Sequence, residues 1–316
     1  MRKLLAITLL LLGACGQQDS GSGNTSAEGP AGEGVAVIYT VNYPLAWMAR
    51  TLAGDAARVI FPAPAGEDPA FWQPDTATLL QFQQADLVLL NGANYARWVA
   101  GVSLPASRLL DTSAAYRDQL LAVEAAPVHS HGPGGEHSHG DLAFTTWLDL
   151  ELARGQLQAV AAALQQLLPG EAGAIAKRLQ VLDSELGALD ARLVTLGRQL
   201  GAAPLLYSHP VYQYLQRRYQ LNGRALHWEP DQFPEEAHWS ELESLLQTHP
   251  ARLMLWEAAP GPEVTERLAA LGVTVVVFAP MANRPGQGDF KTGMEANIAA
   301  LEAAAVTAAP PQSAGG

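Results

Sequence analysis

Three side chains able to bind a metal follow apolar runs in the second half of the chain. His209 ends PLLYSH, Glu229 ends RALHWE and Glu257 ends RLMLWE. One imidazole and two carboxylates form a ligand set that Zn²⁺, Mn²⁺ and Fe²⁺ accept. If the runs are strands of one parallel sheet, their carboxyl ends meet at one edge, where ligands of open α/β sheets gather. The pattern predicts a transition-metal site there, with Asp68 or a loop histidine as a fourth ligand.

Structural roles for the same residues stay open at this point. His209 could cap the helix that follows it, and Glu257 could pair with an arginine. Glu229 precedes Pro230 and could bond to backbone amides instead of a metal.

A second set of metal-binding side chains lies in VHSHGPGGEHSHG, residues 128–140. This His-rich loop holds four of the chain's eight histidines in two His-x-His pairs: His129, His131, His137 and His139. Zinc, copper and nickel all accept imidazole, which is near neutral around pH 7. A glycine-rich loop loses entropy when it closes on an ion, so we expect moderate affinity. A solvated loop without a ligand is the alternative.

Strands and helices alternate on both sides of the His-rich loop. We expect strands at VAVIYTV (35–41), ARVIF (57–61), DLVLLNG (86–92) and SRLLDTS (107–113), with helices at 44–54 and 74–85. The second half repeats the alternation, with strands at 204–209, 224–229, 252–257 and 274–280. This order predicts an α/β fold of two Rossmann-like lobes with parallel sheets, covering residues 35–168 and 201–307.

Residues 171–200 carry apolar side chains at intervals of four and three, which is the period of one face of an α-helix. We interpret this segment as a single long helix that joins the two lobes and limits hinge motion between them. A coiled coil is the alternative.

The N-terminus reads MRKLLAITLLLLGAC, with a basic start and an apolar run too short to span a membrane as a helix. Leu12–Cys15 resembles a bacterial lipobox, so residues 1–14 are predicted to be a lipoprotein signal peptide and Cys15 the lipidated residue. Residues 15–34 and 308–316 lack the apolar side chains of a core. We expect a flexible tether and a disordered tail, and an extracytoplasmic monomer held to the membrane by lipid alone.

The net charge of −12 argues against binding to nucleic acid or to anionic lipid surfaces. The sequence contains no GxSxG elbow, HExxH motif or Walker loop, so no enzyme activity is predicted.

Most of the chain after the tether resembles the solute-binding proteins of bacterial zinc and manganese ABC transporters. The resemblance rests on the lipobox, ADLVLLNGANYARW (85–98), the His-rich loop before TWLDL, the long helix and SHPVYQYLQRRYQL (208–221). It implies two α/β lobes, a metal-sized cleft between them, and delivery of the ion to an ABC permease.

Three of the four ligand positions that the resemblance implies are occupied by other residues. His209 is retained, whereas Ala70, Thr146 and Ala279 stand where the family pattern has two histidines and an acid. The family's ligand set therefore cannot be transferred as it stands.

We expect a solute-binding protein that captures a transition metal, with zinc favoured, and delivers it to a permease. Two alternatives stay open. One is a metal-buffering accessory lipoprotein that acts through its His-rich loop. The other binds a small organic molecule or metal chelate beside Trp72, Trp147, Trp228 and Trp256.

Overall fold

The computed structural model describes residues 34–123, 129–130, 136–137, 142–229 and 232–308. The predicted signal peptide, Cys15, the predicted tether up to residue 33, residues 309–316 of the predicted tail, His131 and His139 lie outside the described residues. The backbones of β5 (His129–Ser130) and β6 (Glu136–His137) pair antiparallel in the His-rich loop.

The first lobe contains a four-stranded parallel sheet. Its strands are β1 (Ala36–Thr40), β2 (Ala57–Ile60), β3 (Leu87–Leu90) and β4 (Leu109–Asp111), in the order β2-β1-β3-β4. Helix α1 (Tyr43–Ala53) begins where the Asn42 side chain accepts a hydrogen bond from the Leu45 amide. Helix α2 (Thr76–Gln84) begins in the same way at Asp75, as the sequence predicted.

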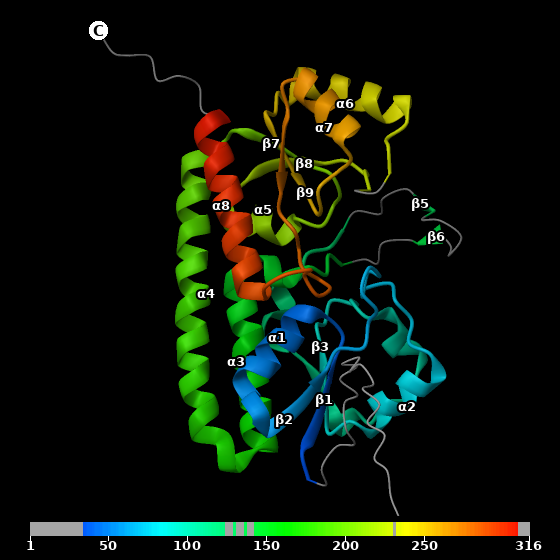
Figure 1. The fold of residues 1–316 in the computed structure, drawn as a ribbon, viewed down its shortest axis with the longest axis vertical. Coiled ribbons are helices and arrows are strands. Elements are labelled where there is room, and N and C mark those ends of the chain that lie inside the picture. The colour runs from blue at the N-terminus through cyan, green and yellow to red at the C-terminus, as the bar shows by residue number, and fades with distance from the viewer. Residues whose placement is uncertain (1–33, 124–128, 131–135, 138–141, 230–231, 309–316) are drawn as a thin grey trace, which may run out of the picture. The chain divides into compact units, whose positions relative to one another are not determined.

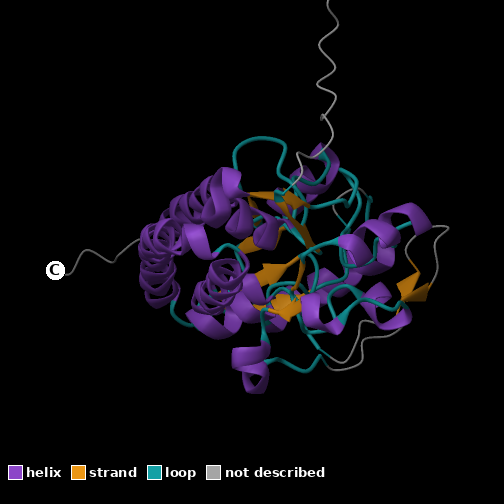
Figure 2. Ribbon diagram, turned by 90° about the horizontal axis from the view of Figure 1, so that it is seen from below, coloured by secondary structure: helices purple, strands orange, loops and turns teal. Residues whose placement is uncertain are grey.

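The second lobe repeats this architecture. Its strands are β7 (Pro204–Tyr207), β8 (Asn222–Ala225), β9 (Leu253–Trp256) and β10 (Thr274–Val277), all parallel in the order β10-β9-β7-β8. Its helices are α5 (Gln213–Tyr219), α6 (Glu236–Thr248), α7 (Pro262–Ala270) and α8 (Phe290–Ala308). Figure 2 shows helices on both sides of the strands. The expected fold class is confirmed.

Strand β8 lies two residues earlier than predicted and ends four residues before Glu229. The chain nevertheless stays beside β7, because Leu226 N donates to Tyr207 O and Trp228 N donates to Ser208 O, both at 2.8 Å. These two bonds carry Glu229 to the end of the neighbouring strand although the regular ladder has stopped.

Helix α3 (Leu150–Leu167) is followed by the long helix α4 (Ala172–Leu200), which runs along both lobes in Figure 1. Helix α4 contacts α1 and α3 of the first lobe and α5 and α8 of the second lobe. Its apolar face is buried in those contacts: Ile175, Leu182, Leu186, Leu189, Leu193 and Leu196. The seam therefore packs within the chain itself, and the single joining helix is confirmed over the coiled coil.

Hydrogen bonds also connect loops of the two lobes directly. Trp147 Nε1 donates to Pro280 O at 2.7 Å, Tyr214 OH donates to Ala143 O at 3.0 Å, and Asn283 Nδ2 donates to Pro64 O at 2.6 Å. Within the described part of the chain, no helix combines the length and the apolar character needed to cross a bilayer.

Candidate functional site

The strand order of the second sheet brings the three predicted ligands together. Strand β7 lies between β8 and β9, and the loops that follow these strands carry His209, Glu229 and Glu257 respectively. Ser208 N donates to Leu255 O at 2.9 Å, which holds the loop of His209 against the end of β9. His209 is therefore flanked by an acid from each side.

The two carboxylates lie at different nitrogens of the His209 ring. Glu229 Oε1 is 3.5 Å from Nε2, and Glu257 Oε1 is 3.4 Å from Nδ1. The histidine side chain is 11% exposed and the two acids are about a quarter exposed. An ion bound at one ring nitrogen thus has one of these carboxylates beside it, and the other lies behind the ring.

Asp68 adds a third acid, from the loop after β2 in the first lobe. Its Oδ1 accepts a hydrogen bond from Ala70 N at 2.9 Å, and burial raises the pKa of its carboxyl group. Burial, together with the charges of Asp68 and Glu229, raises the pKa of Glu257 to about 8. Acids from both lobes therefore repel each other beside His209, and a cation would relieve that repulsion.

The ligands are not arranged around one ready-made point. Across the described ranges, no group of three or more histidine, cysteine, aspartate or glutamate side chains has the geometry to hold a metal ion. Two members of the His-rich loop, His131 and His139, lie outside those ranges.

The positions that depart from the family pattern are filled by packed side chains. Ala70 and Thr146 are 2% and 0% exposed, and Thr146 Oγ1 lies 3.4 Å from the Tyr116 hydroxyl. Asn297 bonds both backbone groups of Ala279, accepting from its N–H at 3.0 Å and donating to its C=O at 2.7 Å. No imidazole or carboxylate stands at any of the three places.

The tryptophans expected to line an organic-ligand cavity do not do so. Trp147, Trp228 and Trp256 are at most 2% exposed and pack in the core, and only Trp72 is half-buried. For these three tryptophans the expectation was wrong, because their side chains pack in the hydrophobic core and do not line a cavity.

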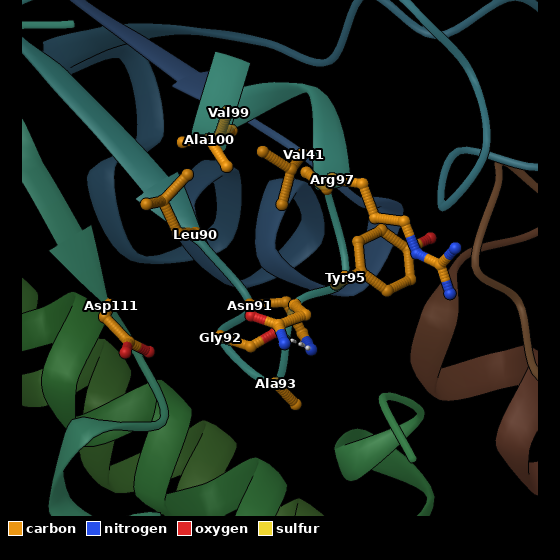
Figure 3. Close-up of a pocket in the computed structure, with 12 residues that line it drawn as sticks. Val41, Leu90, Asn91, Gly92, Ala93, Tyr95, Arg97, Val99, Ala100 and Asp111 are labelled. Carbon is orange, nitrogen blue, oxygen red and sulfur yellow. Dashed lines mark hydrogen bonds between the residues drawn. The ribbon is translucent and has the colours of Figure 1, made fainter. Parts of the chain in front are cut away.

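A pocket of about 510 Å³ lies beside the turn that follows β3, where Figure 3 shows Asn91, Gly92 and Ala93. It is lined mainly by apolar groups of the first lobe and by the Arg97 side chain, and it includes none of the three acids around His209. The Arg97 guanidinium disfavours a cation in this pocket, and the carboxylate that lines it, Asp111, already accepts a hydrogen bond from Ser113 and pairs with Arg117, so we place the candidate site at His209.

Two further side chains near this site were not among the predicted ligands. The His227 ring lies edge-on to the His209 ring, with centroids 6.1 Å apart. Tyr95 is 2% exposed, and its hydroxyl has no hydrogen-bond partner among the residues that the structure describes. Burial raises the pKa of the Tyr95 hydroxyl, and the charge of Asp68 raises it further. His227 follows β8 and Tyr95 follows β3, and this position after the carboxyl end of a strand is the sequence signal that could have identified them.

Comparison with known proteins decides the family. Residues 38–304 match the family model described as zinc-uptake complex component A, periplasmic. The chain belongs to this family. A curated relative, the zinc-binding lipoprotein AdcA of Streptococcus pneumoniae, is 24% identical over 311 residues, which cover 95% of this chain. The chain spans 59% of the length of that relative.

Solved structures show the same fold at low identity. The Zn(II)-bound ZnuA-like domain of Streptococcus pneumoniae AdcA matches with a TM-score of 0.73 and 20% identity, covering 86% of this chain and 99% of that domain. The binding protein FpvC of Pseudomonas aeruginosa, in complex with Ni²⁺, matches with a TM-score of 0.66 and 20% identity, covering 87% and 98% of the two chains. The two parallel-sheet lobes and the joining helix are thus common to these proteins.

Proposed function

We propose that this chain is the extracytoplasmic binding component of an ABC uptake system for a divalent transition metal, with zinc as the cargo. It captures the ion at His209 and delivers it to a permease, as a monomer attached to the membrane through lipid on Cys15. The family supports this role, and the acids around His209 are the observation that carries it.

The separations between ligand atoms support a metal at His209. Two ligand atoms bound to one tetrahedral Zn²⁺ at about 2.1 Å stand about 3.4 Å apart. The nitrogen-to-oxygen distances at the ring are 3.5 Å to Glu229 and 3.4 Å to Glu257. A charge-assisted hydrogen bond would be shorter, at about 2.7–2.9 Å. The nitrogen-to-oxygen separation on each side of the ring is thus close to that of two ligand atoms sharing one Zn²⁺.

Charge supports a cation over a neutral ligand. Glu229 and Glu257 flank one imidazole, and the charges of Asp68 and Glu229 contribute to the raised pKa of Glu257. We propose these three acids as the oxygen ligands that replace the residues missing at positions 70, 146 and 279. An imidazole with carboxylates suits Zn²⁺ but also Mn²⁺ and Fe²⁺, and FpvC binds Ni²⁺. Zinc is the proposed cargo because the family and AdcA bear its name.

The His-rich loop is proposed as an auxiliary collector. Its four histidines are His129, His131, His137 and His139. Their imidazoles are largely neutral around pH 7 and so can bind metal, and the site proposed at His209 does not include them. Removal of residues 128–140 should therefore lower the number of weakly bound ions and leave one tight site.

Titration calorimetry with Zn²⁺, Mn²⁺ and Ni²⁺ tests the proposal, on the intact chain, the loop deletion and His209→Ala. His249→Ala is the matched control, because both histidines are 9% exposed in the same lobe while the His249 ring lies 2.9 Å from the Leu205 carbonyl oxygen. We expect His209→Ala to abolish the tight site and His249→Ala to retain it. Tight binding that survives His209→Ala, or disappears with the loop alone, would overturn the proposal.

A further inference from the structure

The two sides of the His209 ring face different surroundings. On the Nδ1 side lies Glu257, whose neighbour Asp68 comes from the first lobe. On the Nε2 side lies Glu229, and the ring of His227, two residues earlier in the chain, stands beside His209. The Nδ1 side therefore carries an acid that feels the charge of Asp68 from the other lobe, whereas the Nε2 side carries the acid whose chain segment also holds a second imidazole.

A neutral imidazole has a lone pair on one nitrogen only and carries a proton on the other. Metal-binding histidines usually donate that N–H to a carboxylate or carbonyl, which fixes the tautomer and the ring orientation. With Glu257 at Nδ1 and Glu229 at Nε2, one glutamate can accept the ring N–H while the other binds the ion held by the opposite ring nitrogen. Either ring nitrogen could bind the ion, so the choice depends on which of the two sides holds more ligands.

The place of His227 in the chain favours the Nε2 side, because Leu226 N and Trp228 N both bond to the β7 segment and so residues 227 and 229 share one face. Two imidazoles on one Zn²⁺, each with a bond of about 2.1 Å, have ring centres about 5–6 Å apart. The rings of His209 and His227 are 6.1 Å apart at an angle of 89°. His227 is exposed, so a small rotation of its side chain costs little packing. Glu229 comes from the same extended segment and already lies 3.5 Å from Nε2.

We propose that His227 is a metal ligand, which together with His209 Nε2 and Glu229 holds the ion at the Nε2 side of the ring. This inference rests on the function proposed above and refines it. Of the three acids proposed above as oxygen ligands, only Glu229 then binds the ion: Glu257 accepts the Nδ1 proton and orients the ring, and the charge of Asp68 acts on Glu257 from the other lobe. Two imidazoles and one carboxylate favour Zn²⁺, Ni²⁺ or Cu²⁺ over Mn²⁺.

The test uses the chain without residues 128–140, so that the remaining histidines report alone. Co²⁺ serves as the spectroscopic probe, and X-ray absorption of the loaded protein counts imidazole ligands. We expect two imidazoles in the loop-deleted protein and one in its His227→Ala variant. Affinity for Co²⁺ and Zn²⁺ should fall at least about tenfold, since even groups behind the ligands are worth 10–100-fold.

His238→Ala is the matched control, because it also removes one partly accessible histidine of this lobe but lies at the start of α6. Thermal denaturation verifies that each variant is folded. Unchanged affinity and two imidazoles in His227→Ala would overturn this inference while the function proposed for His209 stands. A loop-deleted chain that binds no Co²⁺ or Zn²⁺, or that binds them equally well after His209→Ala, would overturn both.

Discussion

His209 owes its central place to the strand that precedes it. Strand β7 is an inner strand, so a residue just beyond its end has neighbours on both sides, from β8 and β9. A histidine can use both neighbours because its ring nitrogens point in different directions. Alanine at the same position would offer no ligand atom, and a carboxylate would repel the acids on both sides.

The raised pKa of Glu257 predicts a pH-dependent stability of the metal-free protein. Between the ordinary value of 4.5 and about 8, the folded chain retains a proton at Glu257 that the unfolded chain has released. The free energy of unfolding should therefore decrease as pH rises through this window, by up to about 1.4 kcal/mol per pH unit from this group. Glu257→Gln should remove that part of the slope, as measured by urea denaturation in the presence of a chelator.

Asp68→Asn provides the control. It removes one of the charges that raise the pKa of Glu257 and leaves the Glu257 carboxyl group in place. Its slope should lie between those of the unchanged chain and Glu257→Gln. If Glu257→Gln keeps the full slope, then another group is responsible and the crowding of these acids has been misassigned.

That Glu229 and Glu257 gather around His209 was predictable from sequence, but the ring nitrogen that each of them faces was not. Polar residues after apolar runs pointed to His209, Glu229 and Glu257, since parallel strands share a carboxyl edge. Which acid faces which ring nitrogen depends on the order of strands in the sheet, and sequence order alone does not give it. His227 was visible two residues before Glu229, but its distance from His209 depends on how the chain leaves β8.

At the scale of elements, the fold was largely predictable because most segments obey one periodicity. The apolar spacing of residues 171–200 gave α4 to within one residue. The start of α2 followed from Asp75 as N-cap. The β5–β6 pair was not foreseen, because His, Ser, Gly and Glu give no strand pattern. The strand predicted at 224–229 lies two residues too late relative to β8, because the residues after Ala225 stay beside β7 but outside the regular ladder.

Helix α4 depends on a close approach at Gly197. A Cβ atom at this position would collide with the carbonyl oxygen of Tyr219, at the end of α5. Gly197→Ala should destabilise the chain by about 1–3 kcal/mol through overpacking, although alanine is the better helix former. Urea denaturation followed by circular dichroism measures the effect.

The matched control is Gly187→Ala in the interior of the same helix. There an added Cβ meets only the Arg154 side chain, at the ordinary contact distance of 3.8 Å. This variant should be neutral or more stable by up to about 1 kcal/mol, from helix propensity alone. Equal effects of the two substitutions would mean that the contact between α4 and α5 does not limit the packing.

At the scale of the whole described chain, several connections oppose independent movement of the two lobes. Helix α4 packs against helices of both lobes, and one hydrophobic core cluster includes residues of both. Loops on the site's own edge are bonded across the lobes as well, through Trp147 to Pro280 and Asn283 to Pro64. A hinge motion would have to break these contacts together.

We therefore expect binding of Zn²⁺ to change the molecule locally. Hydrogen exchange should slow in the segments that carry the proposed ligands, around Asp68, from Leu226 to Glu229, and after Trp256. Exchange in α3 and α4 should stay the same, since their packing holds with or without the ion. Mass-spectrometric exchange on the metal-free and zinc-loaded chain measures this directly, with His209→Ala treated identically to subtract effects of ions bound elsewhere. Slower exchange along α4, or a smaller radius of gyration in solution on loading, would instead indicate closure of whole lobes. In that case the bonds from Trp147 and Asn283 could not persist in both states, and capture of the ion would depend on lobe movement rather than on the loops around His209.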